Sequence, residues 1–317
     1  MKKVLAFSAL ALAALSANAQ LSIYGLLDGS YGKSIADDAT GRKADFHSGG
    51  DDGSSQGNST SRIGFKGSYD IGSGTKANFK LETGGIGSDG RVNQGGTFFN
   101  RQAWFGMSGS WGEVRFGRQD SLPFQVMAGY DQNGASNGVS AWAYSTVGPW
   151  GPTRDRQSKA LNYISPAFGG LTAQLGLTLK GNDANAKDTY SVGLTYATGP
   201  FSASLVHESK RTQTGDDFTS VAGSYDFGVA KISAGYADAS DNNKGVSLGV
   251  STKLAGLTLG AQYSKNTKGL KDEAVELFVN KEVFKNTYGY FEVGHAKNNA
   301  VANNKGTGYA AGLIFVF

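Results

Sequence analysis

The sequence predicts an all-β protein, a transmembrane antiparallel β-barrel of about sixteen strands with a long third loop folded into its lumen. Three observations support this fold class. Segments of about ten residues alternate apolar and polar side chains, which is the periodicity of a strand whose two faces meet different environments. After residue 19, no segment approaches the run of about 18 apolar residues that a membrane-spanning helix needs. The 47 glycines and only 5 prolines suit a sheet that bends while keeping its backbone hydrogen bonds.

The amino terminus has the pattern of a secretory signal peptide. Met1–Lys3 carries two positive charges, Val4–Ala17 is apolar, and Ala17–Ala19 forms an A-x-A cleavage site. We therefore expect residues 1–19 to be removed and residues 20–317 to form the barrel. Loss of the two lysines lowers the formal net charge from +4 to about +2, which gives no reason to expect a nucleic-acid partner. The absence of cysteine means that disulfides do not stabilise the exported chain.

The expected early strands follow one another with short turns on one side only. The first runs from about residue 21 to 33 and is followed by a polar loop to about residue 57. The next elements in order are strands at about 58–69, 75–83, 98–108 and 113–118, with tight turns at 70–74 and 109–112.

The second half repeats the same unit. In residues 171–180, Leu171, Leu175 and Leu179 share one face and alternate with small or polar residues. Tight turns are expected at 166–170, 197–200, 226–228, 254–256 and 284–286. About seven short turns then alternate with about eight longer segments, which predicts an even number of strands and both termini on the periplasmic side.

The last strand ends on an aromatic residue. Tyr309, Ala311, Leu313, Phe315 and Phe317 lie on one face, so the strand has aromatic residues at both ends and aliphatic residues between them. A strand that crosses a bilayer needs this order. The terminal phenylalanine resembles the signature of Gram-negative outer-membrane barrels that the barrel assembly machinery reads, so Phe317 is the expected assembly signal. The alternative is the edge strand of a soluble sandwich.

Residues 119–158 break the alternation. This segment contains three of the five prolines and many aromatic residues. A loop of this length and aromatic content is not expected to extend into solvent. We predict that it folds into the barrel and that Phe124, Trp142 and Trp150 pack it against the wall; the alternative for the tryptophans is an aromatic surface for sugars.

The chain resembles a known family, the trimeric general porins of Gram-negative bacteria, and in particular their β-proteobacterial branch. The resemblance covers the whole chain after the signal peptide. It is carried by LSIYGLLD at 21–28, SRIGFKG at 61–67, FNRQA at 99–103, VRFGRQ at 114–119, NYISPAFGG at 162–170 and the terminal Phe317. The resemblance implies a sixteen-stranded barrel, a homotrimer, a second loop (about 84–97) held against a neighbouring subunit, and a third loop that narrows the pore.

Strand phase and the resemblance together indicate a basic wall. The phase points Arg62, Lys80 and Arg156 into the lumen, and the resemblance adds Arg101. In the family, acids of the third loop usually face this cluster, and the candidates here are Asp120, Asp131 and Asp155. An arginine wall that faces few acids leaves a positive constriction, which predicts anion preference. The alternative is that the arginines only line a polar lumen and form local salt bridges.

The function expected from these features is passive diffusion of small hydrophilic solutes and ions across the outer membrane. A substrate-specific anion channel is the closest alternative, and a barrel adhesin or barrel enzyme is a more distant one. The GIGSDG segment at 85–90 is followed by no helix pattern, so a nucleotide site is not expected. The three histidines lack ligand spacing, so neither a metal site nor a cofactor is predicted. The expected partners are the homotrimer, outer-membrane lipid and lipopolysaccharide, and the assembly machinery; no nucleic acid is expected.

Overall fold

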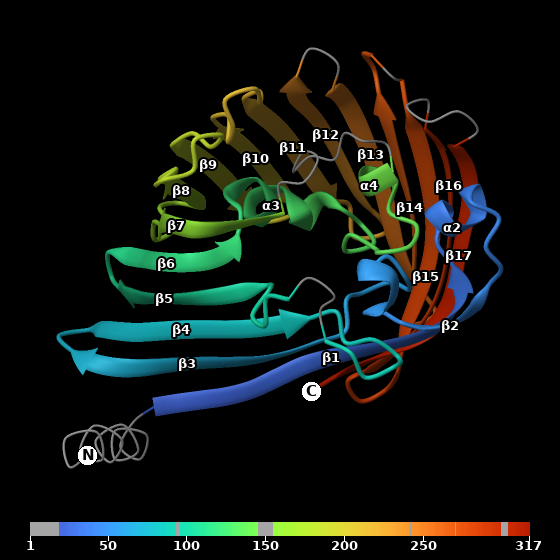
Figure 1. The fold of residues 1–317 in the computed structure, drawn as a ribbon, viewed down its shortest axis with the longest axis horizontal. Helices are drawn as coiled ribbons and strands as arrows, with labels where there is room; N and C mark the ends of the chain where they lie inside the picture. Colours follow the sequence, from blue (N-terminus) through green and yellow to red (C-terminus); the bar gives the residue numbers. More distant parts are fainter. Residues whose placement is uncertain (1–18, 93–95, 145–154, 241–242, 270, 299–303) are drawn as a thin grey trace.

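A single sheet of antiparallel strands closes on itself and forms a barrel (Figure 1). The computed structural model describes residues 19–92, 96–144, 155–240, 243–269, 271–298 and 304–317. The predicted signal peptide therefore lies outside the described residues, apart from Ala19. The strands are β1 (Ala19–Lys33), β2 (Asp45–Ser48), β3 (Arg62–Gly72), β4 (Thr75–Gly84), β5 (Gln102–Gly109), β6 (Gly112–Asp120), β7 (Arg156–Ile164), β8 (Leu171–Thr178), β9 (Thr189–Thr198), β10 (Phe201–Glu208), β11 (Phe218–Asp226), β12 (Lys231–Ser240), β13 (Asn243–Leu254), β14 (Leu257–Asn266), β15 (Glu273–Phe284), β16 (Thr287–Asn298) and β17 (Asn304–Val316).

The strands β2 and β3 share one position in the barrel wall. The long first strand β1 pairs with β3 along residues 19–26 and with the short strand β2 along residues 29–32. The 17 strands of the described residues therefore occupy sixteen positions around the wall. This confirms the predicted closed antiparallel barrel of about sixteen strands.

The barrel closes between the first strand and the last. Residues 26–33 of β1 pair with residues 309–316 of β17. The final residue extends this ladder, because Gly25 N–H donates to the Phe317 carbonyl at 2.9 Å and Phe317 N–H donates to the Gly25 carbonyl at 3.1 Å. A Cβ atom at Gly25 would lie 2.4 Å from the Phe317 ring, so glycine is required there to make room for that ring. The Phe317 ring also stacks on Phe315.

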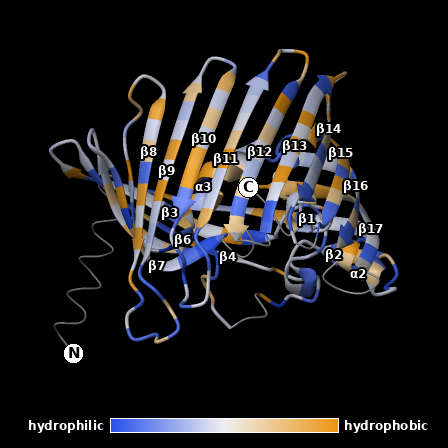
Figure 2. Ribbon diagram, turned by 90° about the horizontal axis from the view of Figure 1, so that it is seen from above, coloured by the Kyte–Doolittle hydropathy of each residue, from blue (hydrophilic) through white to orange (hydrophobic). Residues whose placement is uncertain are grey.

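Apolar side chains cover the outside of the wall. Along β13, Val246, Leu248 and Val250 are exposed and alternate with buried Gly245 and Ser247. Bands of apolar residues cross the strands in the same way in Figure 2. In lipid, every backbone polar group must be paired within the protein, and a closed ladder meets this requirement. None of the helices in the described ranges is long and apolar enough to cross a membrane.

The described part of the second loop packs against the first loop of the same chain. Ser88 N–H donates to Asp51 Oδ1 at 2.9 Å, and Ser48 Oγ donates to the Ile86 carbonyl at 2.5 Å. The sequence analysis expected this loop to reach a neighbouring subunit. In this structure the small residues Gly50 and Gly87 let the two loops approach, and a Cβ atom at Gly50 would lie 2.2 Å from the Ile86 carbonyl oxygen.

Candidate functional site

The long segment between β6 and β7 lies inside the barrel. It contains the helices α3 (Leu122–Met127), η2 (Ala128–Tyr130) and α4 (Ala141–Tyr144), which the strands surround in Figure 1. Ser121 caps α3, because its hydroxyl accepts a hydrogen bond from Phe124 N–H at 3.3 Å, and Pro123 occupies the first turn. The start of the helix therefore follows from the local sequence. Within the segment 119–158, residues 145–154 lie outside the described residues.

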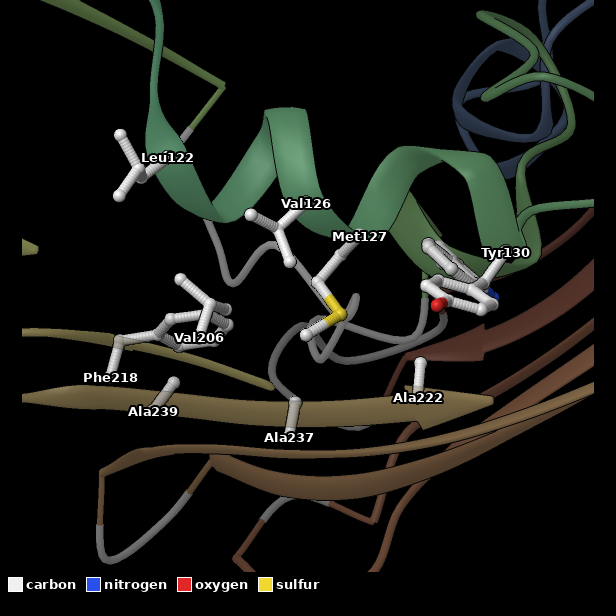
Figure 3. Packing of buried hydrophobic residues seen from close by; sticks show 10 residues of the cluster. Leu122, Val126, Met127, Tyr130, Val206, Phe218, Ala222, Ala237 and Ala239 are labelled. Atoms are coloured by element: carbon white, nitrogen blue, oxygen red, sulfur yellow. The ribbon is translucent and has the colours of Figure 1, made fainter. Parts of the chain in front are cut away.

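An apolar cluster attaches this loop to the wall. Met127 is fully buried and packs with other apolar side chains of α3 against β10 to β12 (Figure 3). The cluster consists of Leu122, Val126, Met127, Tyr130, Trp142, Val206, Phe218, Ala222, Ala237 and Ala239. The Tyr130 hydroxyl also lies 2.9 Å from Ser202 Oγ and 2.7 Å from Ser204 Oγ on β10. Small residues on the wall make room for the helix, as at Gly193, where a Cβ atom would lie 2.7 Å from Val126.

Polar contacts attach the next part of the loop. The Gln132 side chain donates to Ser233 Oγ at 2.8 Å and accepts from Ser251 Oγ at 2.7 Å. Glu292 on β16 is fully buried and accepts hydrogen bonds from Asn58, Asn133 and Ser136. These bonds join the loop to the wall at two places, so the loop is fixed along much of its described length.

Arginines line the space between this loop and the wall. A cavity of about 750 Å³ is bordered by Arg62, Arg101, Arg118 and Arg156, with Phe124 and Asp155 at its edge. Its other lining residues are mostly small or polar, including Ser59, Thr60, Ser136 and Asn137. A polar cavity of this kind suits water and small hydrated solutes.

Two of the four arginines are paired with carboxylates. Arg101 Nε lies 2.6 Å from Glu82 Oε1, and Glu82 is only 4% exposed. Arg156 lies 2.6 Å from Asp155 and 3.5 Å from Asp120. Removal of Arg101 would leave the buried Glu82 without its main partner, and breaking such a buried pair costs about 3–5 kcal/mol. These two residues therefore have a structural role as well as a charge.

The other two arginines contact only neutral groups. Arg62 donates to Ser59 Oγ at 3.3 Å and to the Thr60 carbonyl at 3.1 Å. Arg118 donates to the Asn100 carbonyl at 2.5 Å and to Ser158 Oγ at 2.7 Å. Among the residues that the structure describes, neither guanidinium has a carboxylate within ion-pairing distance. Both therefore leave positive charge at the border of the cavity.

Lys80 lies next to the cavity and not on it. Its Nζ is 3.7 Å from Glu82 Oε2 and 5.5 Å from the centre of the Tyr24 ring. Lys66 lies over the same ring at 5.2 Å. Lys66 and Lys80 line a second depression together with Gln20 and Trp104. Positive charge thus continues along the wall from the arginines toward the end of the barrel where the chain begins.

Asp131 does not face the arginines, which corrects the expected arrangement. It is 7% exposed, its Oδ1 accepts from Asn133 N–H at 2.8 Å, and it interacts electrostatically with Glu276 on β15. The turn at Asp131–Asn133 directs the carboxylate toward the wall behind the loop. Burial raises the pKa of the Asp131 carboxyl to about 6. The remaining expected acids, Asp120 and Asp155, are both beside Arg156.

This burial predicts a pH dependence of loop attachment. Because the pKa of Asp131 is higher in the attached loop than its ordinary value of 3.8, attachment is strongest below about pH 4 and weakens as the pH rises through about 6. Over this pH range the free energy of loop attachment changes by on the order of 3 kcal/mol. We expect Asp131→Asn to reduce this pH dependence, measured as the rate of proteolysis within the loop between pH 4 and 7. Glu276 and Glu292 face the same region and are unchanged in the variant. An unchanged pH profile would contradict the assignment to Asp131.

The aromatic residues predicted to pack the loop have different positions. Trp142 is 1% exposed and belongs to the apolar cluster. Phe124 is half-buried and borders the cavity. Trp150 lies outside the described residues. Arg118 was not among the residues predicted for the basic wall. The β6–β7 pairing shifts register between Gly117 and Gln119, so strict alternation fails there.

These features define a membrane-spanning β-barrel with an apolar exterior and a polar, cationic interior. A family model described as Gram-negative porin matches residues 6–313, and the chain belongs to this family. Its curated relatives include outer membrane porin protein 32 of Delftia acidovorans, 34% identical over 192 residues, and an outer membrane porin protein of Bordetella pertussis, 30% identical over 209 residues. These alignments cover 56% and 57% of the chain and 54% and 52% of the relatives, so they span about half the length of each relative.

Solved structures share the whole fold. The anion-selective porin from Comamonas acidovorans superposes with a TM-score of 0.76 at 24% identity, covering 94% of this chain and all of that one. A loop-deletion form of OmpT from Vibrio cholerae gives a TM-score of 0.70 at 16% identity, covering 95% of this chain and all of that one. The protein is thus a multi-strand barrel of the Gram-negative outer membrane, and its family consists of channels and not of enzymes.

Proposed function

We propose that this protein is a passive channel through which small hydrophilic solutes and ions cross the outer membrane, with a preference for anions. One observation carries the proposal: a polar cavity of about 750 Å³ inside the barrel is bordered by four arginines. Arg62 and Arg118 have no carboxylate partner among the described residues, so the fixed charge at this place is positive.

The mechanism requires only position and charge. The attached loop narrows the lumen, and the remaining opening limits the size of the solute. Fixed positive charge between low-dielectric walls raises the local concentration of anions and lowers that of cations. Each solute moves down its own gradient, so the proposal includes no cofactor and no energy source. The porin from Comamonas acidovorans is described as anion-selective, and this supports the proposal by analogy.

The proposal includes partners and processing. We infer that residues 1–19 are removed on export and that residues 20–317 form a homotrimer through the apolar outer face of the early strands. The assembly machinery would recognise the terminal strand through Phe317. Outer-membrane lipid and lipopolysaccharide would surround the rest of the barrel, and the proposal includes no nucleic-acid partner.

Electrical recording tests the proposal directly. Purified protein added to a planar bilayer is expected to produce stepwise increases in conductance. In a KCl gradient, the zero-current potential is expected to report chloride as the more permeant ion. A zero-current potential that reports potassium as the more permeant ion would overturn the anion preference. Heat-modifiable migration on a gel shows that the barrel is folded, and if such folded protein produced no conductance steps, the proposed channel would be overturned.

A channel specific for one anion is the second candidate. It is favoured by the arrangement of Arg62, Arg101 and Arg156 around one cavity, since several guanidinium groups can bind an anion with more than one charged group. Saturable block of the chloride current by a polyvalent organic anion would support this candidate. If the chloride current changed only with the ionic strength of the solution and did not saturate with the organic anion, the general channel would be supported.

A further inference from the structure

Part of the first loop lies inside the barrel, next to the third loop. This part, residues 53–60, begins at the end of the short helix η1 (Asp51–Gly53) and leads to β3; we call it the inner segment of the first loop. The cavity that the four arginines border is also lined by residues 134–137 of the third loop and by Gly53, Ser54, Ser59 and Thr60 of the inner segment. Two loops therefore narrow the lumen around the cavity.

Hydrogen bonds join the inner segment to the third loop. Gly138 N–H donates to the Gly57 carbonyl at 3.0 Å, and Asn137 N–H donates to the Asn58 carbonyl at 2.9 Å. The Asn58 side chain donates to Asn133 Oδ1 at 3.3 Å and to Glu292 Oε2 of the wall at 2.8 Å. Because backbone polar groups away from water need such partners, the two loops hold each other in position.

A buried carboxylate of the wall holds the inner segment from behind. Asp28 lies on the inward face of β1, and its Oδ2 accepts hydrogen bonds from Asn58 N–H at 2.8 Å and Ser59 N–H at 2.7 Å. Its Oδ1 accepts a hydrogen bond from the Tyr290 hydroxyl at 2.8 Å. Hydrogen bonds to a carboxylate are about twice as strong as those between neutral groups. Asp28 therefore ties the inner segment to β1 and β16 at one point.

Glycine at position 57 allows this close approach to the wall. Gly57 has a φ of +64°, a backbone conformation that residues with a Cβ atom rarely adopt. A Cβ atom there would lie 2.9 Å from Asp28 Oδ2 and 3.0 Å from the Tyr290 hydroxyl oxygen. A larger residue at this position would therefore push the inner segment away from the wall.

We propose that the inner segment of the first loop is a second constriction element of the pore and that Asp28 is the residue that positions it. The inference rests on the proposed function and adds a determinant of pore width to it. Ser59 Oγ and the Thr60 carbonyl also accept hydrogen bonds from Arg62, at 3.3 and 3.1 Å, so the position of the segment affects the direction of that guanidinium. Solutes pass between the inner segment, the third loop and the arginines.

Chemical modification of an introduced thiol tests where the inner segment lies. The chain has no cysteine, so a single introduced cysteine is the only site for a thiol reagent. Ser54→Cys treated with a sulfonate-bearing methanethiosulfonate places one negative charge at the cavity, and we expect the chloride-to-potassium permeability ratio to fall by about threefold. Thr40→Cys is the matched control. It lies in the same loop and is exposed, and its modification should leave the ratio unchanged.

Asp28→Ala tests the positioning role. Loss of the hydrogen bonds to this carboxylate should raise the detached fraction of the inner segment by at least about tenfold. We expect wider substates of the single-channel current and entry of larger neutral polyethylene glycols, which report pore width and not charge. Gly57→Ala acts on the loop instead of the wall and should widen the pore in the same way. The control is Asp238→Ala, which removes a carboxylate that pairs with Lys244 and should leave the polymer cut-off unchanged.

The outcomes separate this inference from the proposed function. Wild-type protein without conductance steps would overturn the proposed function and this inference with it. If the wild type conducts, two results overturn the inference alone. One is an unchanged permeability ratio in the modified Ser54→Cys channel. The other is a polymer cut-off that stays the same in both Asp28→Ala and Gly57→Ala, or in Gly57→Ala if Asp28→Ala does not fold.

Discussion

Replacing Arg62 with glutamate is expected to lower the chloride-to-potassium permeability ratio by about tenfold. A unit charge about 7 Å from a passing ion is worth about 0.6 kcal/mol in water, and screening at about 0.1 M salt reduces this to about 0.3 kcal/mol. Because the charge attracts chloride and repels potassium by this amount, it changes the ratio of the two ions by about threefold. Arg62→Ser removes one charge and Arg62→Glu changes the charge by two, so the two variants should give about threefold and about tenfold effects. The zero-current potential in a KCl gradient at about 0.1 M salt measures both, because screening is still moderate there.

Arg62 is a better test than Arg101. Both border the cavity, but Arg101 is paired with the buried Glu82, so its removal also disturbs the wall. Arg62 contacts only a hydroxyl and a carbonyl, and those groups can bind water instead. A change in selectivity on replacing Arg62 therefore reports charge.

Arg91→Ser is the matched control for this prediction. Arg91 is an exposed arginine of the second loop that pairs with Asp89, and it does not line the cavity. Its removal takes away the same charge and should leave the permeability ratio unchanged. If Arg62→Glu and Arg91→Ser gave the same ratio as the wild type, the positive cavity would have no part in selectivity.

Met127→Ala is expected to free the inner loop from the wall. Met127 is fully buried in the apolar cluster (Figure 3). Truncation of such a side chain costs about 2–5 kcal/mol, and because the lost contacts join the loop to the wall, the cost falls on loop attachment. A loss of about 3 kcal/mol raises the detached fraction more than a hundredfold. We expect faster proteolysis within the loop and larger fluctuations of the single-channel current.

Leu205→Ala separates loop attachment from general damage to the strand. Leu205 is next to Val206 on β10, but it is 45% exposed on the outer face, whereas Val206 is fully buried against the loop. Leu205→Ala should leave both readouts unchanged. Equal effects of Met127→Ala and Leu205→Ala would mean that the apolar cluster does not hold the loop.

The barrel itself could be predicted because its physical cause repeats in every strand. Lipid outside and water inside impose the same alternation on each segment, so errors in one strand do not change the architecture. An inward-folded third loop was expected from the length and aromatic content of residues 119–158. The shared position of β2 and β3 was not predictable, because Asp45–Ser48 is short and lies within a polar loop without a strand pattern.

The details of the site depended on features that alternation does not show. Asp131 turns toward the wall because of a local hydrogen bond to Asn133 N–H. Arg118 lies where the pairing of β6 with β7 shifts register, so the inward and outward alternation of β6 does not give the direction of its side chain. Arg62 and Arg156 were predicted from strand phase to face the lumen. In the structure both border the cavity. Phase is therefore informative within a regular strand, and structure is needed where a bulge or a loop interrupts it.

The hydrogen bonds between Gly25 and Phe317 have a consequence for assembly of the barrel. The barrel closes only when β1 meets β17, so the sheet has two unpaired edges until this junction forms. Unpaired edges of this kind associate with other chains. A prematurely terminated product lacks the partner for its first strand and stays open, which exposes it to degradation. Formation of this single junction thus completes the barrel.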